Sequence, residues 1–168
     1  MSVPWPPAPI RTERLVLRES QARDRQAYVE LFASPEVGTY LGGPRPREEL
    51  ERTAPAVPGR RPGVFVADLD GTMIGTVTVE RRDPERPGSG EFELGYMFLP
   101  SAWGHGYAFE ACTAVLGWFA EAVPGEPVAL CTQTANERSL RLATKLGFTE
   151  VRRFEEFGAE QWFGVWSA

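Results

Sequence analysis

A glycine-containing turn between an expected strand and an expected helix is the segment of this chain best suited to ligand chemistry. It reads Trp103-Gly-His-Gly-Tyr-Ala108 and follows a strand expected over 91–98. The first amide N–H groups of a helix lack partners within the helix and carry partial positive charge. Gly104 and Gly106 present no Cβ, so a phosphate or pyrophosphate could approach the main chain closely without help from a lysine. The same glycines also fit a tight connection that binds nothing, because short glycine motifs are weak signals.

Side chains for several other chemistries are scarce. The chain has one His, two Cys and, among its 18 basic residues, a single lysine, Lys145. His105, Cys112 and Cys131 do not have the close spacing of a zinc site, and Leu146 stands where a P-loop would need Ser or Thr after its lysine. The only histidine lies inside the glycine turn, which leaves little room for a Ser-His-Asp or Cys-His arrangement. Both cysteines are expected to be packing residues.

The composition indicates an ordinary globular protein. A net charge of −5 argues against binding to nucleic acid or to an anionic membrane, both of which attract basic surfaces. The start of the chain is rich in proline and lacks the basic and apolar regions of a secretory signal, and no run is apolar enough to span a membrane. With two widely separated cysteines, these features predict a cytoplasmic protein. A length of 168 residues predicts one domain over 1–168, with a proline-rich arm at 1–10.

The elements that must position the turn can be read from periodicity and turn signals. Strands are expected at 14–19, 64–68, 72–80, 91–98, 127–134, 148–157 and 160–166, and helices at 24–32, 46–54, 107–122 and 136–146. Asp70-Gly71 predicts a hairpin, Gly147 predicts a helix end, and 37–43 is expected to be a loop. The order predicts a mixed α/β sheet of six to seven strands, mostly antiparallel, with one parallel β-α-β crossover between 91–98 and 127–134.

Three motifs in the same order resemble those of the GNAT N-acetyltransferase superfamily. They are Glu93-Leu-Gly-Tyr-Met-Phe-Leu-Pro100, the turn that begins at Trp103, and Asn136-x-x-Ser139 followed by Lys145-Leu-Gly-Phe148. With the first strand, which lies within 11–18, the chain is more narrowly similar to the RimJ/RimL-type branch. The resemblance covers about 10–166. It implies a GNAT-like sheet in which the two strands of the crossover splay apart, with helices on its flanks.

The resemblance also implies a co-substrate, acetyl-CoA, and no metal. The amides of the glycine turn would bind the pyrophosphate, and the exposed main chain of the preceding strand would pair with the pantetheine arm. An amide near Met97 would polarise the thioester carbonyl, and Asn136 would contact pantetheine. The cofactor-binding residues implied in this way are Met97, Phe98, Leu99, Trp103, Gly104, His105, Gly106, Tyr107, Ala108 and Asn136.

Two residues are candidates for proton transfer. Glu93 lies four residues before Met97 on the same strand face, and the family often has a glutamate there that takes the proton of the amine through water. Glu93 could equally be a partly solvated glutamate or the partner of an arginine, and Glu91 is a weaker substitute. Many family members protonate the leaving thiolate with a tyrosine where this chain has Ala143. Ser139 is the alternative acid, although serine in a first helical turn can also be a simple cap.

The resemblance implies an acetyl-CoA-dependent N-acetyltransferase in which a primary amine attacks the thioester directly in a ternary complex. The acceptor would be a protein N-terminus or a small amine, read by residues 34–62 and the C-terminal hairpin, and the branch is compatible with a homodimer. A non-catalytic acyl-CoA-binding module with the same fold is the alternative. The arginine pairs at 60–61, 81–82 and 152–153 are expected to be solvated charge, with one pair within reach of the CoA phosphates.

Overall fold

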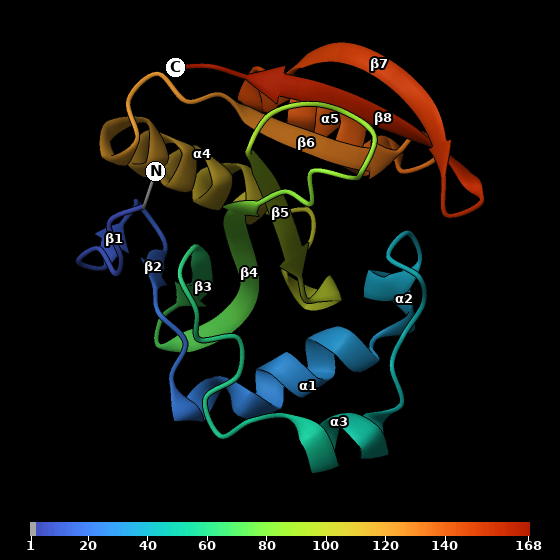
Figure 1. Ribbon diagram of the computed structural model, residues 1–168. Helices are drawn as coiled ribbons and strands as arrows, with labels where there is room; N and C mark the ends of the chain where they lie inside the picture. Colours follow the sequence, from blue (N-terminus) through green and yellow to red (C-terminus); the bar gives the residue numbers. More distant parts are fainter. Residues whose placement is uncertain (1–2) are drawn as a thin grey trace.

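The computed structural model in Figure 1 describes residues 3–168, so the first two residues of the predicted arm lie outside the described part of the chain. Its strands are β1 (Ile10–Arg11), β2 (Val16–Arg18), β3 (Val64–Leu69), β4 (Thr72–Arg81), β5 (Phe92–Phe98), β6 (Val128–Gln133), β7 (Thr149–Glu156) and β8 (Ala159–Trp166). Its α-helices are α1 (Arg25–Ala33), α2 (Pro35–Gly38), α3 (Arg47–Thr53), α4 (Tyr107–Ala122) and α5 (Glu137–Leu146).

All of these strands form one sheet, in the order β1-β2-β3-β4-β5-β6-β8-β7. Every neighbouring pair is antiparallel except β5 and β6, which are parallel and joined through α4. The mixed sheet with one crossover is therefore confirmed. The sheet has eight strands and not the predicted six to seven, because the arm adds β1, which pairs Ile10 with Leu17 and Arg11 with Val16. A strand of two residues is too short to show a period in the sequence.

The segment expected to be a loop at 37–43 begins inside a one-turn helix, α2. Pro35 ends α1, as proline does in a helix interior, and then occupies the first turn of α2, where its missing N–H costs nothing. The Ser34 hydroxyl oxygen accepts a hydrogen bond from the Val37 amide at 3.2 Å and so caps the new turn. The sequence Ser34-Pro35 was the signal for this helix.

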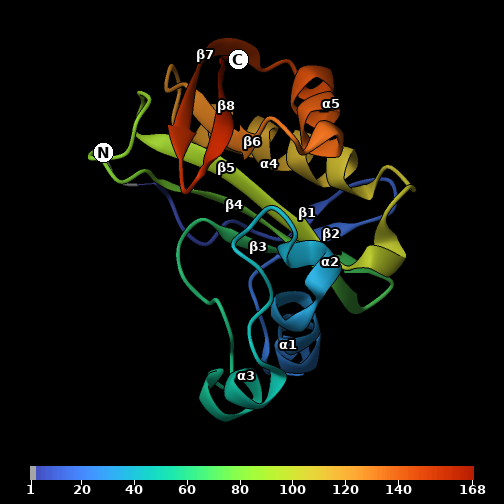
Figure 2. The same cartoon turned by 90° about the vertical axis from the view of Figure 1, so that its right-hand side faces the viewer.

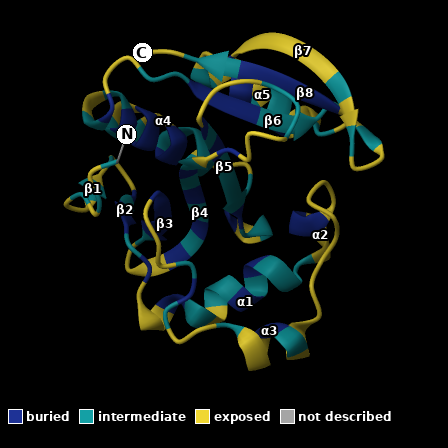
Figure 3. Ribbon diagram, viewed as in Figure 1, coloured by how far each residue is buried: buried dark blue, intermediate teal, exposed yellow. Residues whose placement is uncertain are grey.

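Helices cover both faces of the sheet (Figure 2). The larger core lies between the sheet and α4, where Phe92 on β5 and Phe119 on α4 meet edge to face with ring centroids 5.0 Å apart. A smaller core joins α1 to Val66, Met73 and Met97 on the other face. Figure 3 shows that burial is concentrated in β3, β4, β6 and α4, whereas the edge strand β7 is mostly exposed. The central strands and α4, the helix that the glycine turn opens, are thus the most buried elements of the described chain.

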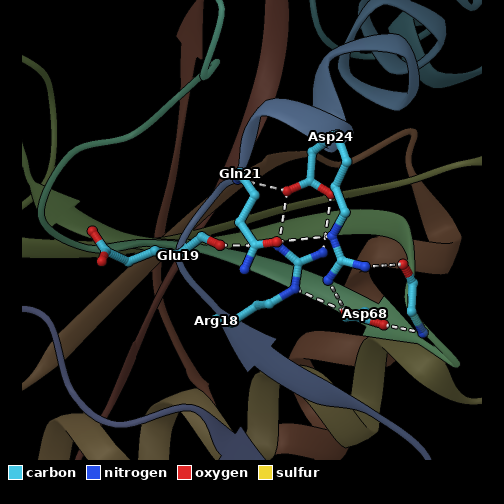
Figure 4. Close-up of polar contacts among 7 residues, drawn as sticks. Arg18, Glu19, Gln21, Asp24 and Asp68 are labelled. Carbon is cyan, nitrogen blue, oxygen red and sulfur yellow. Dashed lines mark hydrogen bonds and ion pairs between the residues drawn. The ribbon is translucent and has the colours of Figure 1, made fainter.

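A buried ionic network fixes the start of α1 against the sheet (Figure 4). Arg18 on β2 donates to both carboxylate oxygens of Asp24, at 2.8 and 3.0 Å, and to Asp68 on β3 at 2.8 Å. Asp24 also accepts the Gln21 amide at 2.8 Å, and Asp68 accepts the Gly71 amide of the hairpin at 2.6 Å. Because Arg18, Asp24 and Asp68 are all buried, the loss of any one of them would leave a buried charge without its partner.

Candidate functional site

β5 and β6 are paired only at their first residues and then separate. Their register contains Phe92 with Val128 and Glu93 with Ala129 and no further pair within the described chain. Beyond this point a cleft of about 810 Å³ opens between the two strands. Its lining includes residues 94–98 of β5, residues 130–132 of β6, the start of α5 and the segment 36–41 around α2. The splayed crossover that the sequence resemblance implied is therefore present.

The ladder between β4 and β5 decides which backbone groups of β5 face this cleft. Leu99 donates its amide to the Ile74 carbonyl at 2.9 Å, and the Arg82 amide donates to Glu91 at 2.7 Å, at the two ends of one continuous register. Because bonded and non-bonded pairs alternate in an antiparallel ladder, Met97 directs its N–H toward β4. The amides of its neighbours, Tyr96 and Phe98, face the cleft. They are the candidates for the amide that was expected near Met97.

The glycine turn opens α4 at the end of the cleft. Gly104 and Gly106 both have a left-handed backbone, with φ of 82° and 81°, and Gly106 is the residue that precedes the helix. A side chain at either position would be strained for this reason alone. The geometry agrees with the argument from sequence: the first amides of α4 stand in an exposed turn with no Cβ in front of them.

An arginine from the N-terminal strand region holds this turn from outside. Arg14 donates through Nη1 to the His105 carbonyl at 2.9 Å and through Nε to the Glu110 carboxylate at 2.7 Å. Its guanidinium also lies 4.4 Å from the centroid of the Tyr107 ring. Burial raises the pKa of Glu110, but hydrogen bonds from Thr12 and Arg14 outweigh it and hold that pKa below its usual range. Arg14 thus neutralises a carboxylate in the first turn of α4, which would repel an anion.

A second cavity of about 440 Å³ adjoins the cleft, and the two share Phe98, Trp103, Ala108, Arg138, Arg141 and Leu142. One wall is the glycine turn, and the other is a face of α5 that carries Arg138, Arg141 and Lys145. Arg138 stacks over the Trp103 ring at 4.3 Å, and the Lys145 ammonium lies 4.2 Å from the centroid of Phe109. Helix N-terminal amides and three cations around one cavity suit a ligand with several phosphates.

Ser139 lies at the inner wall of the cleft, in the first turn of α5. It is 7% exposed, and its amide donates to the Asn136 side-chain oxygen at 3.2 Å, so Asn136 is the helix cap. The Ser139 hydroxyl is hydrogen-bonded to the hydroxyl of Tyr96 on β5, and either oxygen can be the donor. Burial raises the pKa of Tyr96 above its ordinary value, so this phenol is protonated at neutral pH. All three residues line the cleft.

Glu93 is paired with two arginines, which agrees with the alternative interpretation that it is the partner of an arginine. Its carboxylate lies 3.2 Å from Arg86 Nη1 and 3.7 Å from Arg82 Nε, and Arg86 continues to Glu156 at 3.0 Å. Burial raises the pKa of Glu93, and the charges of the two arginines offset this only in part. Glu93 shares a strand face with Gly95 and Met97, which line the cleft, but Glu93 is not itself among the described lining residues.

The remaining predicted residues fall into two groups. Trp103, Gly104, Gly106, Tyr107 and Ala108 line the cavity at the turn, and Met97 and Phe98 line the cleft. Leu99 and His105 are absent from the described lining of both, since the Leu99 amide belongs to the sheet and the His105 carbonyl accepts Arg14.

Cys112 is fully buried, and burial raises the pKa of Cys131 to about 11, so neither thiol is a ready nucleophile at neutral pH.

The cations that line the cavity were not predicted from the sequence. The arginine pairs at 60–61, 81–82 and 152–153 do not contribute to the described lining of either cavity, and Arg61, Arg81 and Arg153 are bound to glutamates outside it. The cations that line the cavity are instead Arg138, Arg141 and Lys145 of α5. Their spacing of three and four residues puts them on one helix face, which was a readable signal. Tyr96 was missed because its contact with Ser139 joins residues 43 apart in sequence.

Comparison with known proteins identifies the family. Residues 14–149 match the model of the acetyltransferase (GNAT) domain, and the chain belongs to this family. It is 27% identical over 152 residues to the uncharacterized N-acetyltransferase YoaA of Bacillus subtilis (strain 168), covering 83% of this chain and 81% of the relative.

Solved structures show the same fold. A GNAT-family acetyltransferase from Bacillus anthracis aligns with a TM-score of 0.78 at 22% identity, covering 94% of this chain and 97% of the other. RimL, a ribosomal L7/L12 alpha-N-protein acetyltransferase solved in complex with coenzyme A, aligns with a TM-score of 0.74 at 17% identity and the same coverage. At these identities the likeness concerns the fold alone.

Two features are absent from residues 3–168: a cluster of metal ligands and a membrane-spanning helix. No three His, Cys, Asp or Glu side chains in this range are grouped so as to hold a metal ion. None of the helices in it has the length and apolar character needed to cross a bilayer.

Proposed function

We propose that this GNAT protein is an N-acetyltransferase that takes its acetyl group from acetyl-CoA and transfers it to a primary amine by direct attack in a ternary complex. The observation that carries the proposal is the continuous site formed by the cavity at the α4 turn and the cleft between β5 and β6. The cavity at the turn suits a polyanion, and the cleft presents backbone amides of β5 and the hydroxyls of Tyr96 and Ser139.

The residues of the site fit acetyl-CoA in a defined order. The first amides of α4, together with Arg138, Arg141 and Lys145, would hold the phosphates. The open backbone of Tyr96 and Phe98 would pair with the pantetheine arm and place the thioester between β5 and β6. Asn136 would contact the same arm while capping α5. The co-substrate supplies an activated acetyl group, and the protein supplies position and polarity.

Catalysis would then depend on two kinds of protein group. An amide of Tyr96 or Phe98 would donate to the oxyanion that develops on the thioester carbonyl, which is commonly a large contribution to rate. Glu93 would accept the proton of the attacking amine through water, because its raised pKa makes it a stronger base than an exposed glutamate. Ser139 would give a proton to the departing sulfur.

We also propose the side from which the acceptor enters. The segment 36–41 borders the cleft opposite α5 and carries Glu36 and the exposed Leu41. An acidic side chain beside an apolar one suits a cationic amine that is attached to an apolar group, such as a protein N-terminus or a small-molecule amine. We also propose a cytoplasmic location, on the grounds of composition, and a homodimer, on the grounds of the RimJ/RimL-type resemblance.

One observation favours the alternative of a non-catalytic acyl-CoA-binding module. Glu93, the carboxylate proposed as the base, lies between two arginines. Release of free thiol from acetyl-CoA, measured with a panel of peptide N-termini, polyamines and amino acids, separates the two functions. Amine-dependent release supports the transferase. Binding of acetyl-CoA in calorimetry without release with any amine supports the module.

A further inference from the structure

The contact between Tyr96 and Ser139 has a chemical consequence for the departing thiolate. A serine hydroxyl carries one hydrogen. If Ser139 donates it to Tyr96, its oxygen can only accept from the cleft; if Tyr96 donates to Ser139, the serine hydrogen is free for a ligand. Burial keeps Tyr96 protonated, so its hydroxyl has one hydrogen to donate. Two Ser139 oxygens can accept it, the hydroxyl oxygen and the carbonyl oxygen at 3.5 Å, and the hydroxyl oxygen is the nearer of the two.

Resting on the proposed acetyl transfer, we propose that Tyr96 is a positioning residue that donates to Ser139 and so makes Ser139 the proton donor to the leaving sulfur. As the carbon–sulfur bond breaks, Ser139 gives its hydroxyl hydrogen to the sulfur, and Tyr96 gives its own hydrogen to the Ser139 oxygen. The proton that the amine gave to Glu93 passes to solvent, and the Tyr96 oxygen takes one back from solvent through the cleft, so the proton lost by the nitrogen balances the one gained by the sulfur. The serine thus never remains as an alkoxide, which would be far more basic than the thiolate it protonates.

The surroundings of the pair fix its geometry. Tyr96 packs with its ring in the main core next to α4, and Ser139 is held by the Asn136 cap at the start of α5. Both side chains line the same cleft. One oxygen comes from β5 and the other from the first turn of α5. The pair therefore lies where the cleft meets the core. A hydrogen bond between buried groups strengthens the outward donor, because linked hydrogen bonds polarise one another.

The test is a double-mutant cycle on acetyl transfer with Tyr96→Phe, Ser139→Ala and the double variant. Tyr96→Phe removes one oxygen and keeps the ring in the core. We expect kcat to fall by about 10-fold or more, in keeping with the loss of part of an acid's contribution, and KM for acetyl-CoA to stay within about twofold. The double variant should be no slower than Ser139→Ala, because Tyr96 acts through the serine.

Tyr28→Phe is the matched control, since Tyr28 lies on α1 against Phe32 and should leave kcat unchanged. Thermal unfolding and calorimetric binding of CoA show that each variant is folded. Wild-type kcat in Tyr96→Phe, effects that multiply in the double variant, or a change in KM alone would each overturn the inference while leaving the transferase intact. A wild-type protein that binds acetyl-CoA and releases no thiol with any amine would overturn both.

Discussion

Glu93 is the residue on which the proposed proton transfer from the amine depends. Its strand position and even spacing from Met97 predicted that the two side chains share one face of a strand, and both residues lie in β5 at that spacing. Its partners Arg82 and Arg86 come from the irregular connection between β4 and β5, and a side-chain contact across such a connection has no sequence period. The contact between Tyr96 and Ser139 could likewise not be predicted, because the two residues are far apart in sequence and meet only in the folded chain.

The first prediction concerns Glu93→Gln. If Glu93 accepts the proton of the amine, kcat should fall by about 100-fold or more. The pH–rate profile should also lose its acidic limb, which in the wild type lies above the usual glutamate range because the pKa of Glu93 is raised. Activity is expected to rise with pH through that limb as the carboxylate ionises. Glu80→Gln, which breaks the exposed ion pair with Arg61, is the control. A normal rate and an unchanged profile in Glu93→Gln would exclude it as the base.

At the scale of elements, the start of α4 and one face of α5 form the two walls of the cavity at the glycine turn. The sequence predicted the first wall from its glycines, and α4 has the expected bounds, Tyr107–Ala122. It did not predict that Arg14, more than ninety residues away along the chain, supports the turn through the His105 carbonyl. Support of this kind depends on how β2 and α4 pack, and no local pattern records it.

The second prediction tests the Arg14 support. Arg14→Ala should weaken binding of acetyl-CoA by about 10-fold, because it frees the His105 carbonyl and leaves the Glu110 charge unneutralised in the first turn of α4. Adding Glu110→Gln should restore part of the affinity. Calorimetric titration measures both. Equal affinity for wild type and Arg14→Ala would show that the turn needs no support from outside.

The third prediction tests the cationic wall. Changing Arg138, Arg141 and Lys145 to glutamine should weaken binding of acetyl-CoA by about 100-fold and flatten its dependence on salt, since three phosphate partners are lost. Acetyl-pantetheine, which lacks the nucleotide, should be used equally well by wild type and variant. A triple variant with Arg45, just before α3, and Arg47 and Arg52, within it, changed in the same way is the control. Unchanged affinity would place the phosphates elsewhere.

At the scale of the whole molecule, the pattern of strands and helices was largely predictable and its long-range contacts were not. Amphipathic periods, the Asp70-Gly71 hairpin and the glycine that ends α5 determine the order of elements and the crossover. The added strand β1 and the helix α2 were missed because each spans only about one period of its own pattern, so the pattern cannot repeat within it. The cleft itself results from β5 and β6 separating after two residue pairs, and residues of α2, α4 and α5, which are distant in sequence, line it together.

The fourth prediction concerns the network that ties α1 to this frame. Asp24→Ala should lower the free energy of unfolding by about 3–5 kcal/mol, because it leaves Arg18 buried with part of its charge unpaired. Burial raises the pKa of Asp24, yet the hydrogen bonds from Arg18 and Gln21 lower it further, so the net shift is downward. The contribution is therefore complete above the unfolded pKa and is lost as pH falls through the folded one.

Urea unfolding across acidic pH measures this contribution. The wild type should lose stability relative to Asp24→Ala as the pH falls, and the two curves should converge at the lowest pH. Glu30→Gln, which breaks the exposed pair with Arg47, serves as the control and should change stability little. A constant difference between wild type and Asp24→Ala at every pH would contradict the assigned role of the Asp24 charge.

The most direct test of the central claim is the initial rate of thiol release as the concentrations of acetyl-CoA and an active amine are varied together. Direct attack in a ternary complex predicts release only when amine is present, with double-reciprocal lines that intersect. Parallel lines would contradict direct attack by indicating an acetylated enzyme, and a protein that releases no thiol with any amine would contradict acetyl transfer itself.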